Sequence, residues 1–348
     1  MNRIAPDAFG ATRMDGDAFC RLALSFEEEP LGPLGLTWQW IKFFPAVLIL
    51  LPTRLACIAL LLFCSWVVCR LTALLDGCSS NSSKPDALAA HTGTQKALLG
   101  VNACFVRGVL FVSGYYWIRV KTPPGWSRKS LPPTLVGNHV CMVDSFIVTC
   151  LMHGRVTAVA VDWVTKLPYC NAIARAHHVL AVGREGSGKG DTAKVAPEEG
   201  APRAATATER IVAYQRRCAA DPGLLPLLVC PEGTTKAERT LLQFRSGAFV
   251  SGEPVQPFVH RYPHKHVDTS WIDGTGKTVW RVLTQWRNET EIIMLPVYSP
   301  SPEERSDPKL YADNVQSLIG TAMELPPERV SAAVDKGQLL AFQRAQRG

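Results

Sequence analysis

The chain has 348 residues, 11 cysteines and a formal net charge of +7, and 47% of its residues are hydrophobic. This length accommodates one large domain or two. The positive charge suits an anionic bilayer surface or a polyanionic ligand as well as RNA. The sequence has no zinc-finger spacing, no basic run and no RNA-binding pattern with interleaved aromatics, so we expect no nucleic-acid partner.

Residues 1–38 are predicted to form a polar N-terminal tail. They include Glu27-Glu28-Glu29 and have no early apolar core, so a cleaved signal peptide is not expected. The cysteines contain no Cys-x-x-Cys pair, and Cys57, Cys64 and Cys69 lie in the most apolar segment. Buried free thiols in a reducing compartment are therefore favoured over a disulfide framework.

Residues 39–76 contain the membrane signal. Arg54 divides two uncharged runs, and the second run, 55–69, would extend about 22 Å as a helix, short of a hydrocarbon core of about 30 Å. One joined helix is long enough, but it places Pro52 and Arg54 near its middle, where an arginine costs about 2.5–3.5 kcal/mol. We therefore favour a hairpin bent near these residues, with Arg54 at the headgroups, over a single transmembrane segment.

Residues 77–130 are predicted to form an interfacial helix and a linker. The run from Ala97 to Tyr116 is apolar apart from Arg107, which is typical of a helix packed against a membrane or a domain. Trp117–Lys121 alternates like a strand, and a proline-rich loop follows it.

Residues 131–300 alternate strand-like and helix-like segments, which predicts a layered α/β domain. The helix candidates are Ser145–Met152 and Thr208–Ala219. Short apolar runs predict these strands: Thr134–Val136, Val156–Val161, His178–Val182, Leu224–Val229, Val255–Val259 and Glu291–Val297. Residues 186–207, rich in Gly, Ala, Lys and Glu, are predicted to form a flexible insert, and residues 301–348 a helical C-terminal tail.

The most informative pair of residues is His139 and Asp144. An imidazole with a nearby carboxylate is the minimal device for removing a proton from an alcohol. Positions five apart on one helix diverge by roughly 140°, so the pair can meet only if His139 lies in the turn before the helix. Gly137-Asn138 supplies that turn. Taken alone, this spacing also fits a helix-capping turn with a histidine at the edge of the core.

A second motif, Pro231-Glu232-Gly233-Thr234, follows the predicted strand that ends at Val229. In an open α/β sheet, loops at the carboxyl ends of strands are where ligands bind. A salt-bridged surface Glu232 is the alternative. No Gly-x-Ser-x-Gly elbow occurs, which argues against a serine hydrolase, and the sequence has no Asp-x-Asp-x-Asp-Gly calcium loop.

These motifs resemble those of the glycerophospholipid acyltransferase superfamily, which carries a His-x4-Asp motif followed by Pro-Glu-Gly-Thr. Further segments are similar to the lysophosphatidylcholine acyltransferase branch, and together they extend the resemblance over residues 35 to 325: 244–249, 254–263, 268–271, 295–301 and 310–315. The resemblance implies a mixed β-sheet flanked by helices, behind an N-terminal membrane-associated helical hairpin. It also implies a membrane enzyme, with the endoplasmic reticulum as its compartment.

The implied reaction transfers a fatty acyl chain from acyl-CoA, the co-substrate, to a lysophospholipid hydroxyl at a lipid bilayer, without cofactor or metal. His139 would be the general base and Asp144 would hold it in place. Arg184 would grip the lysolipid phosphate with its planar guanidinium, and Arg245 is a second phosphate candidate, with a surface ion pair as its alternative.

The same resemblance assigns roles to the Glu-Gly-Thr motif. Glu232 would bind glycerol oxygens or orient Arg184, and Thr234 would add a hydroxyl donor. Backbone N–H groups near Gly233, or around Val255–Pro257, are candidates for the oxyanion.

Three functions stay open on the sequence. Lysophosphatidylcholine or lysophosphatidylethanolamine is the favoured acceptor. A lysophosphatidic acid acyltransferase shares the chemistry with a smaller head group. A non-catalytic lipid-binding protein on the same fold belongs to another class, but it has no chemical reason to keep His139, Asp144, Arg184 and Glu232 together.

Overall fold

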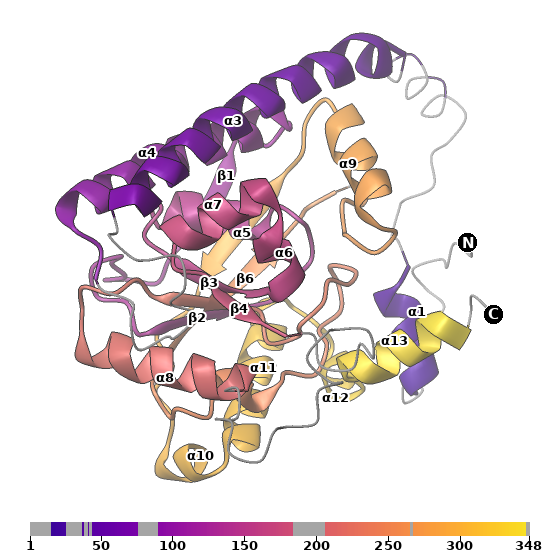
Figure 1. Ribbon diagram of the computed structural model, residues 1–348. Coiled ribbons are helices and arrows are strands. Elements are labelled where there is room, and N and C mark those ends of the chain that lie inside the picture. Colours follow the sequence, from indigo (N-terminus) through magenta and orange to yellow (C-terminus); the bar gives the residue numbers. More distant parts are fainter. Residues whose placement is uncertain are drawn as a thin grey trace, which may run out of the picture.

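The computed structural model describes residues 15–25, 44–75, 90–183, 206–264 and 267–345, together with Thr37 and Ile41. A seven-stranded sheet with the order β1-β7-β6-β2-β5-β3-β4 lies at its centre (Figure 1). Only β6 and β7 pair antiparallel, so the sheet is mixed and mostly parallel. The strands are β1 (Ile118–Lys121), β2 (Thr134–Gly137), β3 (Thr157–Val161), β4 (Leu180–Val182), β5 (Leu227–Val229), β6 (Val255–Arg261) and β7 (Thr290–Met294). The predicted α/β fold class is confirmed.

The central strands are buried on both faces. Every residue of β2 and β5 is buried, as is β6 up to His260. Strands covered on both sides need apolar side chains without alternation, and this explains why short continuous apolar runs located them in the sequence. Gly137 ends β2 where a Cβ atom would lie only 2.2 Å from the Phe258 ring. The chain can therefore leave β2 beside β6 only without a side chain at this position.

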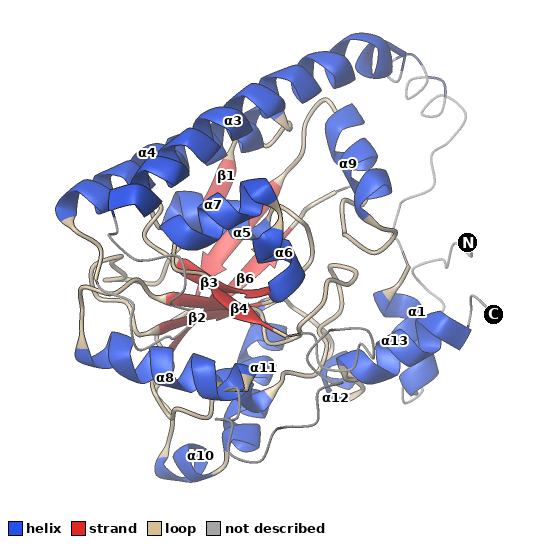
Figure 2. Ribbon diagram, in the orientation of Figure 1, coloured by secondary structure: helices blue, strands red, loops and turns tan. Residues whose placement is uncertain are grey.

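Helices cover both faces of the sheet (Figure 2). On one face, α4 (Gly93–Val112), α5 (Asp144–Leu151) and α9 (Thr275–Thr284) share a buried cluster with the sheet. On the other face, α8 (Ala207–Ala220) and α11 (Pro308–Ala322) bury a second cluster. The remaining short helices are α6 (Asp162–Lys166), α7 (Pro168–Ala176), η3 (Ser246–Ala248), α10 (Pro302–Ser306) and α12 (Pro327–Ser331). The result is a three-layer domain.

The apolar N-terminal region differs from the bent hairpin that we expected within residues 39–76. A π-helical turn, η1 (Ala46–Leu50), continues directly into α3 (Leu51–Leu75), and no bend separates Pro52 from Arg54. The wide π turn, in which Leu51 N–H bonds to Ala46 O, lets the helix accommodate Pro52. The hairpin is instead made by α3 and α4, which lie side by side along one edge of the molecule (Figure 1). Both helices are long and apolar enough to cross a membrane.

Arg54 explains why the helix is not interrupted. Its side chain is 3% exposed and points into the protein, where Nη1 donates to Leu283 O at 2.8 Å and to Gln285 O, and Nη2 donates to Trp286 O at 3.2 Å. These carbonyls lie at the C-terminal end of α9, where helix carbonyls lack intrahelical partners and the dipole favours a cation. The guanidinium therefore attaches α3 to the α/β domain and points away from the exposed face of the helix.

Two helices near the ends of the described chain pack together. Residues 1–38 were expected to form a polar tail, and the helix within them was not predicted. Helix α1 (Gly16–Ala23) buries Phe19 and Ala23 against α13 (Lys336–Ala345) in a small cluster of its own. The C-terminal helices that were expected in a tail are likewise packed on the domain, since α11 contributes Tyr311 and Val315 to its core. The expected insert, 186–207, lies outside the described residues except for Thr206 and Ala207, which begin α8.

Candidate active site

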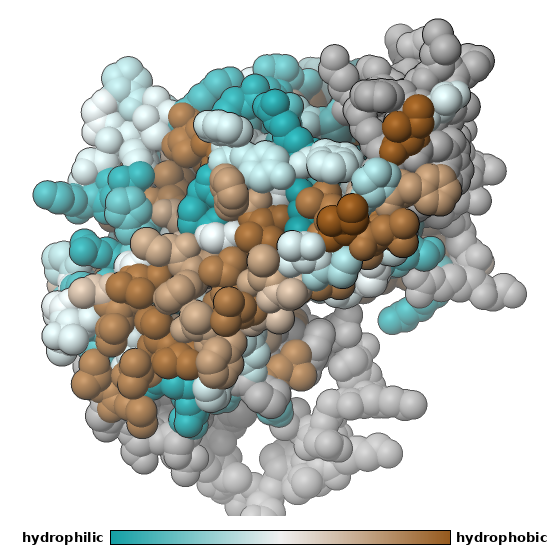
Figure 3. Space-filling view, turned by 90° about the horizontal axis from the view of Figure 1, so that it is seen from above, coloured by the Kyte–Doolittle hydropathy of each residue, from teal (hydrophilic) through white to brown (hydrophobic). Residues whose placement is uncertain are grey.

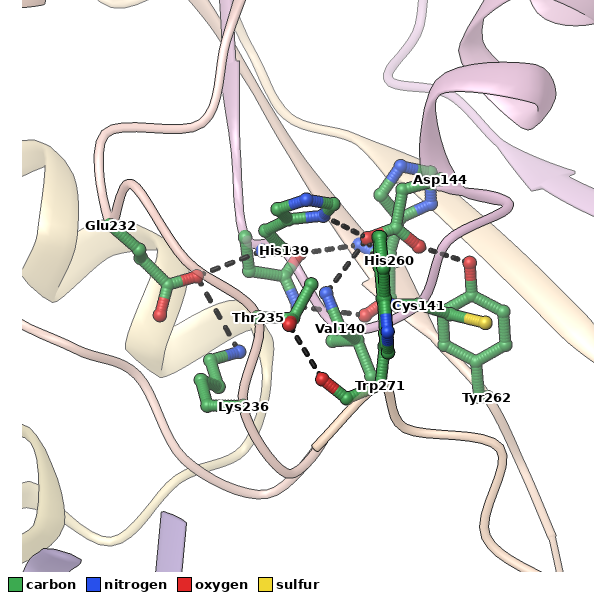
Figure 4. A network of polar contacts seen from close by, with 11 residues as sticks. His139, Val140, Cys141, Asp144, Glu232, Thr235, Lys236, His260, Tyr262 and Trp271 are labelled. Atoms are coloured by element: carbon green, nitrogen blue, oxygen red, sulfur yellow. Dashed lines mark hydrogen bonds and ion pairs between the residues drawn. The ribbon is translucent and has the colours of Figure 1, made fainter. Parts of the chain in front are cut away.

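His139 lies in the loop between β2 and α5, and Asp144 is the first residue of α5. His139 Nδ1 is 2.7 Å from Asp144 Oδ2. The turn before the helix that the spacing requires is therefore present, and it brings the two side chains together (Figure 4). Because an ionised carboxylate can only accept, the hydrogen-bond partners place the proton on Nδ1 and leave Nε2 as an acceptor in the neutral ring. The His139 side chain is 28% exposed, so a substrate can reach it.

Asp144 is buried and receives several hydrogen bonds. Its Oδ2 also accepts the backbone N–H groups of Val140 at 2.7 Å and Cys141 at 3.1 Å, while the hydroxyl of Tyr262 donates to Oδ1. Burial opposes ionisation, but positive charge on the neighbouring histidines and these donors outweigh it and hold the pKa of Asp144 at about 2. Asp144 is thus an anion at neutral pH.

The turn that carries His139 is clamped to strand β6. The Asn138 side chain donates to His260 O at 3.0 Å and accepts the His260 N–H at 2.7 Å. Asn138 is fully buried. These two hydrogen bonds to the His260 backbone take the place of the strand-pairing hydrogen bonds, which end with β2. The position of His139 is therefore fixed by the sheet as well as by Asp144.

Glu232 reaches the same turn from the loop after β5. Its Oε1 accepts the His139 backbone N–H at 2.8 Å and lies 3.5 Å from Lys236 Nζ, and its Oε2 accepts the Leu242 N–H at 2.8 Å. The side chains of Glu232 and Lys236 are both 0% exposed. Burial raises the pKa of Glu232, an effect that the Lys236 ammonium and the two backbone donors oppose. Both oxygens already have protein partners, so Glu232 braces the His139 turn in this conformation instead of presenting a carboxylate to glycerol.

A second connection joins the two motifs. The Thr235 hydroxyl donates to Trp271 O at 2.6 Å, and Trp271 N–H donates to Val140 O at 2.8 Å (Figure 4). The segment around Trp271 therefore lies between the Glu-Gly-Thr loop and the His139 turn. The two loops form one rigid unit at the end of the sheet.

Of the other residues expected at the site, the structure describes Gly233, Thr234 and Arg245 but not Arg184. Gly233 and the half-buried Thr234 lie on the loop beside Glu232, and Arg245 is exposed with its N–H bonded to Pro231 O at 3.1 Å. The Gly233 N–H, proposed for the oxyanion, is already bonded to Cys230 O at 3.0 Å. Arg184 lies outside the described residues.

The expected oxyanion donors in β6 are also engaged. Val255 N–H donates to Tyr298 O at 3.0 Å, the following residues pair with β2, and Pro257 has no N–H. The N–H groups of Gly233 and Val255 are therefore already engaged in this conformation.

Sequence reasoning missed two residues of this network. Tyr262 was quoted only as part of a similar segment, yet its hydroxyl bonds to Asp144 from a position 118 residues away. Lys236 lies four residues after Glu232 and is the buried counter-charge of that carboxylate. The i,i+4 spacing of Glu and Lys was visible in the sequence, but it is typical of exposed helix pairs and gave no indication of burial.

The arrangement can act as a general base. The His139 imidazole is held by a buried carboxylate, its side chain is partly exposed, and its turn is braced by a second buried carboxylate. Such a device takes a proton from a hydroxyl as that oxygen attacks an electrophile, and returns it to a leaving group. Within the described part of the chain, no group of three or more His, Cys, Asp or Glu side chains could hold a metal ion.

The comparisons with known proteins agree with this class of site. A model of the acyltransferase family matches residues 127–261, which include both motifs. Lysophospholipid acyltransferase LPCAT4 of Xenopus tropicalis is 29% identical over 296 residues, which are 83% of this chain and 51% of that protein. Lysophospholipid acyltransferase LPEAT1 of Arabidopsis thaliana is 29% identical over 324 residues, 84% of this chain and 77% of that protein.

Human lysophospholipid acyltransferase LPCAT4 is 30% identical over 293 residues, 83% of this chain and 51% of that protein, so the chain spans about half the length of this relative. The crystal structure of 1-acyl-sn-glycerophosphate (LPA) acyltransferase from Thermotoga maritima is a remote likeness, with 14% identity and a TM-score of 0.44 over 83% of this chain and 94% of that one. The segment 127–261, which carries both motifs, belongs to the acyltransferase family. The resemblance seen in the sequence motifs is confirmed.

Proposed function

We propose that the chain is a membrane-associated acyl-CoA:lysophospholipid O-acyltransferase, with lysophosphatidylcholine or lysophosphatidylethanolamine as acceptor. The observation that carries this proposal is the 2.7 Å contact between His139 Nδ1 and the buried Asp144 carboxylate, which leaves Nε2 facing an accessible site. The names of the relatives, which are lysophospholipid acyltransferases, support the substrate class.

In the proposed reaction, His139 Nε2 takes the proton from the free glycerol hydroxyl of the lysophospholipid. The oxygen forms a bond to the thioester carbonyl carbon of acyl-CoA, and the carbon–sulfur bond then breaks. The proton on His139 passes to the departing thiolate, so CoA leaves as a thiol and the base is restored. Asp144 stabilises the imidazolium during these steps, and Glu232 acts as a positioning residue through the His139 backbone. Arg184 remains a proposed phosphate ligand, and Thr234 a proposed hydroxyl donor.

The proposed membrane face is formed by α3 and α4. Only 6% of the most apolar window of residues 46–75 is buried, and Figure 3, seen from above α3 and α4, has hydrophobic residues gathered there. Large exposed apolar side chains on this face are Leu48, Ile49, Leu60, Phe63, Leu74 and Phe111. A contiguous exposed apolar surface of this kind is typical of a membrane or partner site. We propose the endoplasmic reticulum membrane, on the family resemblance.

Leu60 and Phe63 offer a test of this face. The double substitution Leu60→Gln/Phe63→Gln is expected to weaken binding to phosphatidylcholine vesicles severalfold in a flotation assay, because both side chains are more than half exposed on α3. Leu310→Gln, on the distant α11, is the matched control and is expected to leave binding unchanged. Equal binding by all three proteins would place the membrane elsewhere.

The activity itself is tested by an acyl-transfer assay on membranes that contain the full chain. Radiolabelled acyl-CoA is supplied with lysophosphatidylcholine, lysophosphatidylethanolamine, lysophosphatidic acid or no acceptor. Acylated product with either of the first two supports the proposal, and product with lysophosphatidic acid alone supports the smaller-head-group alternative. Fatty acid release without an acceptor would indicate a hydrolase, and no turnover with bound lipid would indicate a lipid-binding protein.

A further inference from the structure

Exposed tryptophans gather beside the apolar helices. Among the tryptophan side chains that the structure describes, Trp117, Trp280 and Trp286 are exposed, by 73%, 42% and 49%. Trp117 directly precedes β1, Trp280 lies on α9, and Trp286 follows α9. Helix α9 packs against η1 and α3 (Figure 1). Single exposed aromatic residues are ordinary, whereas a contiguous group of them marks an interaction surface.

Tyr116 connects two of these tryptophans to the apolar helices. Its ring packs edge-on against Phe111 of α4, with 5.0 Å between the ring centroids, and against Trp117 at 6.3 Å. Its hydroxyl accepts from Arg54 Nη2 of α3 at 3.2 Å and donates to Trp286 O at 3.0 Å. Tyr116, Trp117 and Trp286 therefore form an aromatic rim that continues the exposed apolar face of α3 and α4.

Charged side chains lie beyond the rim. Arg119 pairs with Glu289 at 2.5 Å, and Arg287 lies 3.3 Å from the same carboxylate. The surface thus passes from apolar side chains such as Leu48 and Ile49 of η1, through the aromatic rim, to these ion pairs. Tryptophan and tyrosine are enriched at the boundary between lipid and water, because each has an apolar ring and a polar N–H or O–H group. The order of side chains therefore favours a bilayer over a protein as the partner of the rim.

The rim lies at the same edge of the sheet as His139. Strand β1 pairs parallel with β7, β7 pairs antiparallel with β6, and β6 pairs parallel with β2. The start of β1, next to Trp117, is therefore at the edge where β2 ends and the His139 turn begins. Three strand spacings separate these two positions, roughly 14 Å along the edge. A membrane that holds the rim therefore also determines how the His139 edge faces the lipid.

We infer that Tyr116, Trp117 and Trp286 insert into the headgroup layer of a bilayer and hold the His139 edge of the sheet toward the lipid. The inference rests on the proposed function, and it extends the proposed membrane face from the two apolar helices to the α/β domain. A lysophospholipid then reaches this edge by moving along the membrane surface.

Tryptophan fluorescence tests the location of the rim. The full chain is bound to phosphatidylcholine vesicles whose acyl chains are brominated close to the headgroup, where bromine quenches tryptophans at the lipid boundary. In Trp117→Phe/Trp286→Phe the quenched part of the emission is expected to fall, while binding persists because phenylalanine is also apolar. Trp126→Phe is the control, since Trp126 Nε1 donates to Gln256 Oε1 at 3.1 Å near the start of β6, at the opposite edge of the sheet. An unchanged quenched emission in the double variant would overturn the inference.

Vesicle partition measures what the rim contributes to binding. Trp117→Ala/Trp286→Ala is expected to weaken partition onto phosphatidylcholine vesicles about 10-fold or more, because two large apolar surfaces no longer enter lipid. Leu310→Ala, on α11, is the control and is expected to bind like the wild type. Neither measurement requires acyl transfer, so both results in a chain without transferase activity would leave the inference standing while the proposed function fails. Equal partition of the double alanine variant and the wild type, or a wild type that does not bind vesicles, would overturn the inference.

Discussion

At the scale of single residues, the hydrogen bonds to Asp144 give the site its chemistry. The carboxylate accepts from the His139 ring, the Tyr262 hydroxyl and two backbone N–H groups. With its pKa lowered to about 2, Asp144 is an anion at neutral pH. It orients the ring of His139, and in the proposed reaction it would support the imidazolium without taking the proton itself.

Tyr262 is expected to contribute through Asp144. Tyr262→Phe removes one donor to a buried carboxylate, a bond worth about 1.5–3 kcal/mol, so kcat is expected to fall roughly 10- to 100-fold with KM for both substrates little changed. The measurement is steady-state acyl transfer in membranes. Tyr298→Phe, which breaks a similar phenol–carboxylate bond to Glu304 away from the site, is the control. Equal activity of Tyr262→Phe and Tyr298→Phe would show that Tyr262 does not contribute to turnover through Asp144.

At the scale of secondary-structure elements, the site depends on loops that are held by other loops. The Glu-Gly-Thr loop touches the His139 turn through Glu232, and the segment after β6 touches the same loop through His264 and Glu238. Burial disfavours a charged His264. The Glu238 carboxylate and the other acceptors around the His264 ring outweigh burial and raise the pKa of His264 to about 9. Burial also raises the pKa of Asp268, an effect that the charge of His264 opposes.

This histidine gives stability a predictable pH dependence. Because the pKa of His264 in the folded state, about 9, lies above its ordinary value of 6.5, its contribution is complete below about pH 6.5 and is lost as the pH rises through 9. The free energy of unfolding is therefore expected to decrease between pH 6.5 and 9.5, measured by denaturant titration in detergent. His264→Gln should flatten this decrease, and an unchanged slope would contradict the ion pair.

Much of the fold could be predicted from the sequence because the sheet is buried on both faces. Continuous apolar runs located six strands to within about three residues, and alternation located β1. The break before Ser145 predicted that His139 lies in the turn beside Asp144, as it does. Contacts between distant segments could not be predicted in this way. Tyr262 bonds to Asp144 across 118 residues, and no local pattern records such a pairing. Arg54 was misjudged for the same reason, since its carbonyl partners lie 229 or more residues away.

At the scale of the whole molecule, Arg54 joins the apolar helices to the α/β domain. Its guanidinium satisfies the carbonyls at the end of α9, and a further polar contact, Ser65 Oγ to Asn102 Oδ1 at 2.6 Å, links α3 to α4. Asn102 continues to the His177 ring at 3.1 Å, so α4 is also tied to the residue that follows α7. Helices α3 and α4 and the α/β domain are therefore expected to unfold as one unit.

Arg54→Met tests this coupling. Loss of the guanidinium leaves several buried carbonyls without a donor, which is expected to cost about 3–5 kcal/mol and lower the thermal midpoint by several degrees. Arg70→Met, at an exposed position of the same helix over the Trp66 ring, is the matched control. Thermal unfolding in detergent and vesicle flotation are measured together. Equal stability of the two variants would mean that α3 is not attached through Arg54.

The central claim, that His139 is the general base and Asp144 its partner, is tested most directly by acyl-transfer kinetics of His139→Ala and Asp144→Asn in membranes. Both variants are expected to lower kcat by about 10²–10⁴, the usual worth of a positioned acid–base group, with KM for lysolipid little changed in Asp144→Asn. His153→Asn, at an exposed histidine with φ +51° that asparagine tolerates, should retain wild-type turnover. Acyl transfer by His139→Ala at close to the wild-type rate would contradict the account.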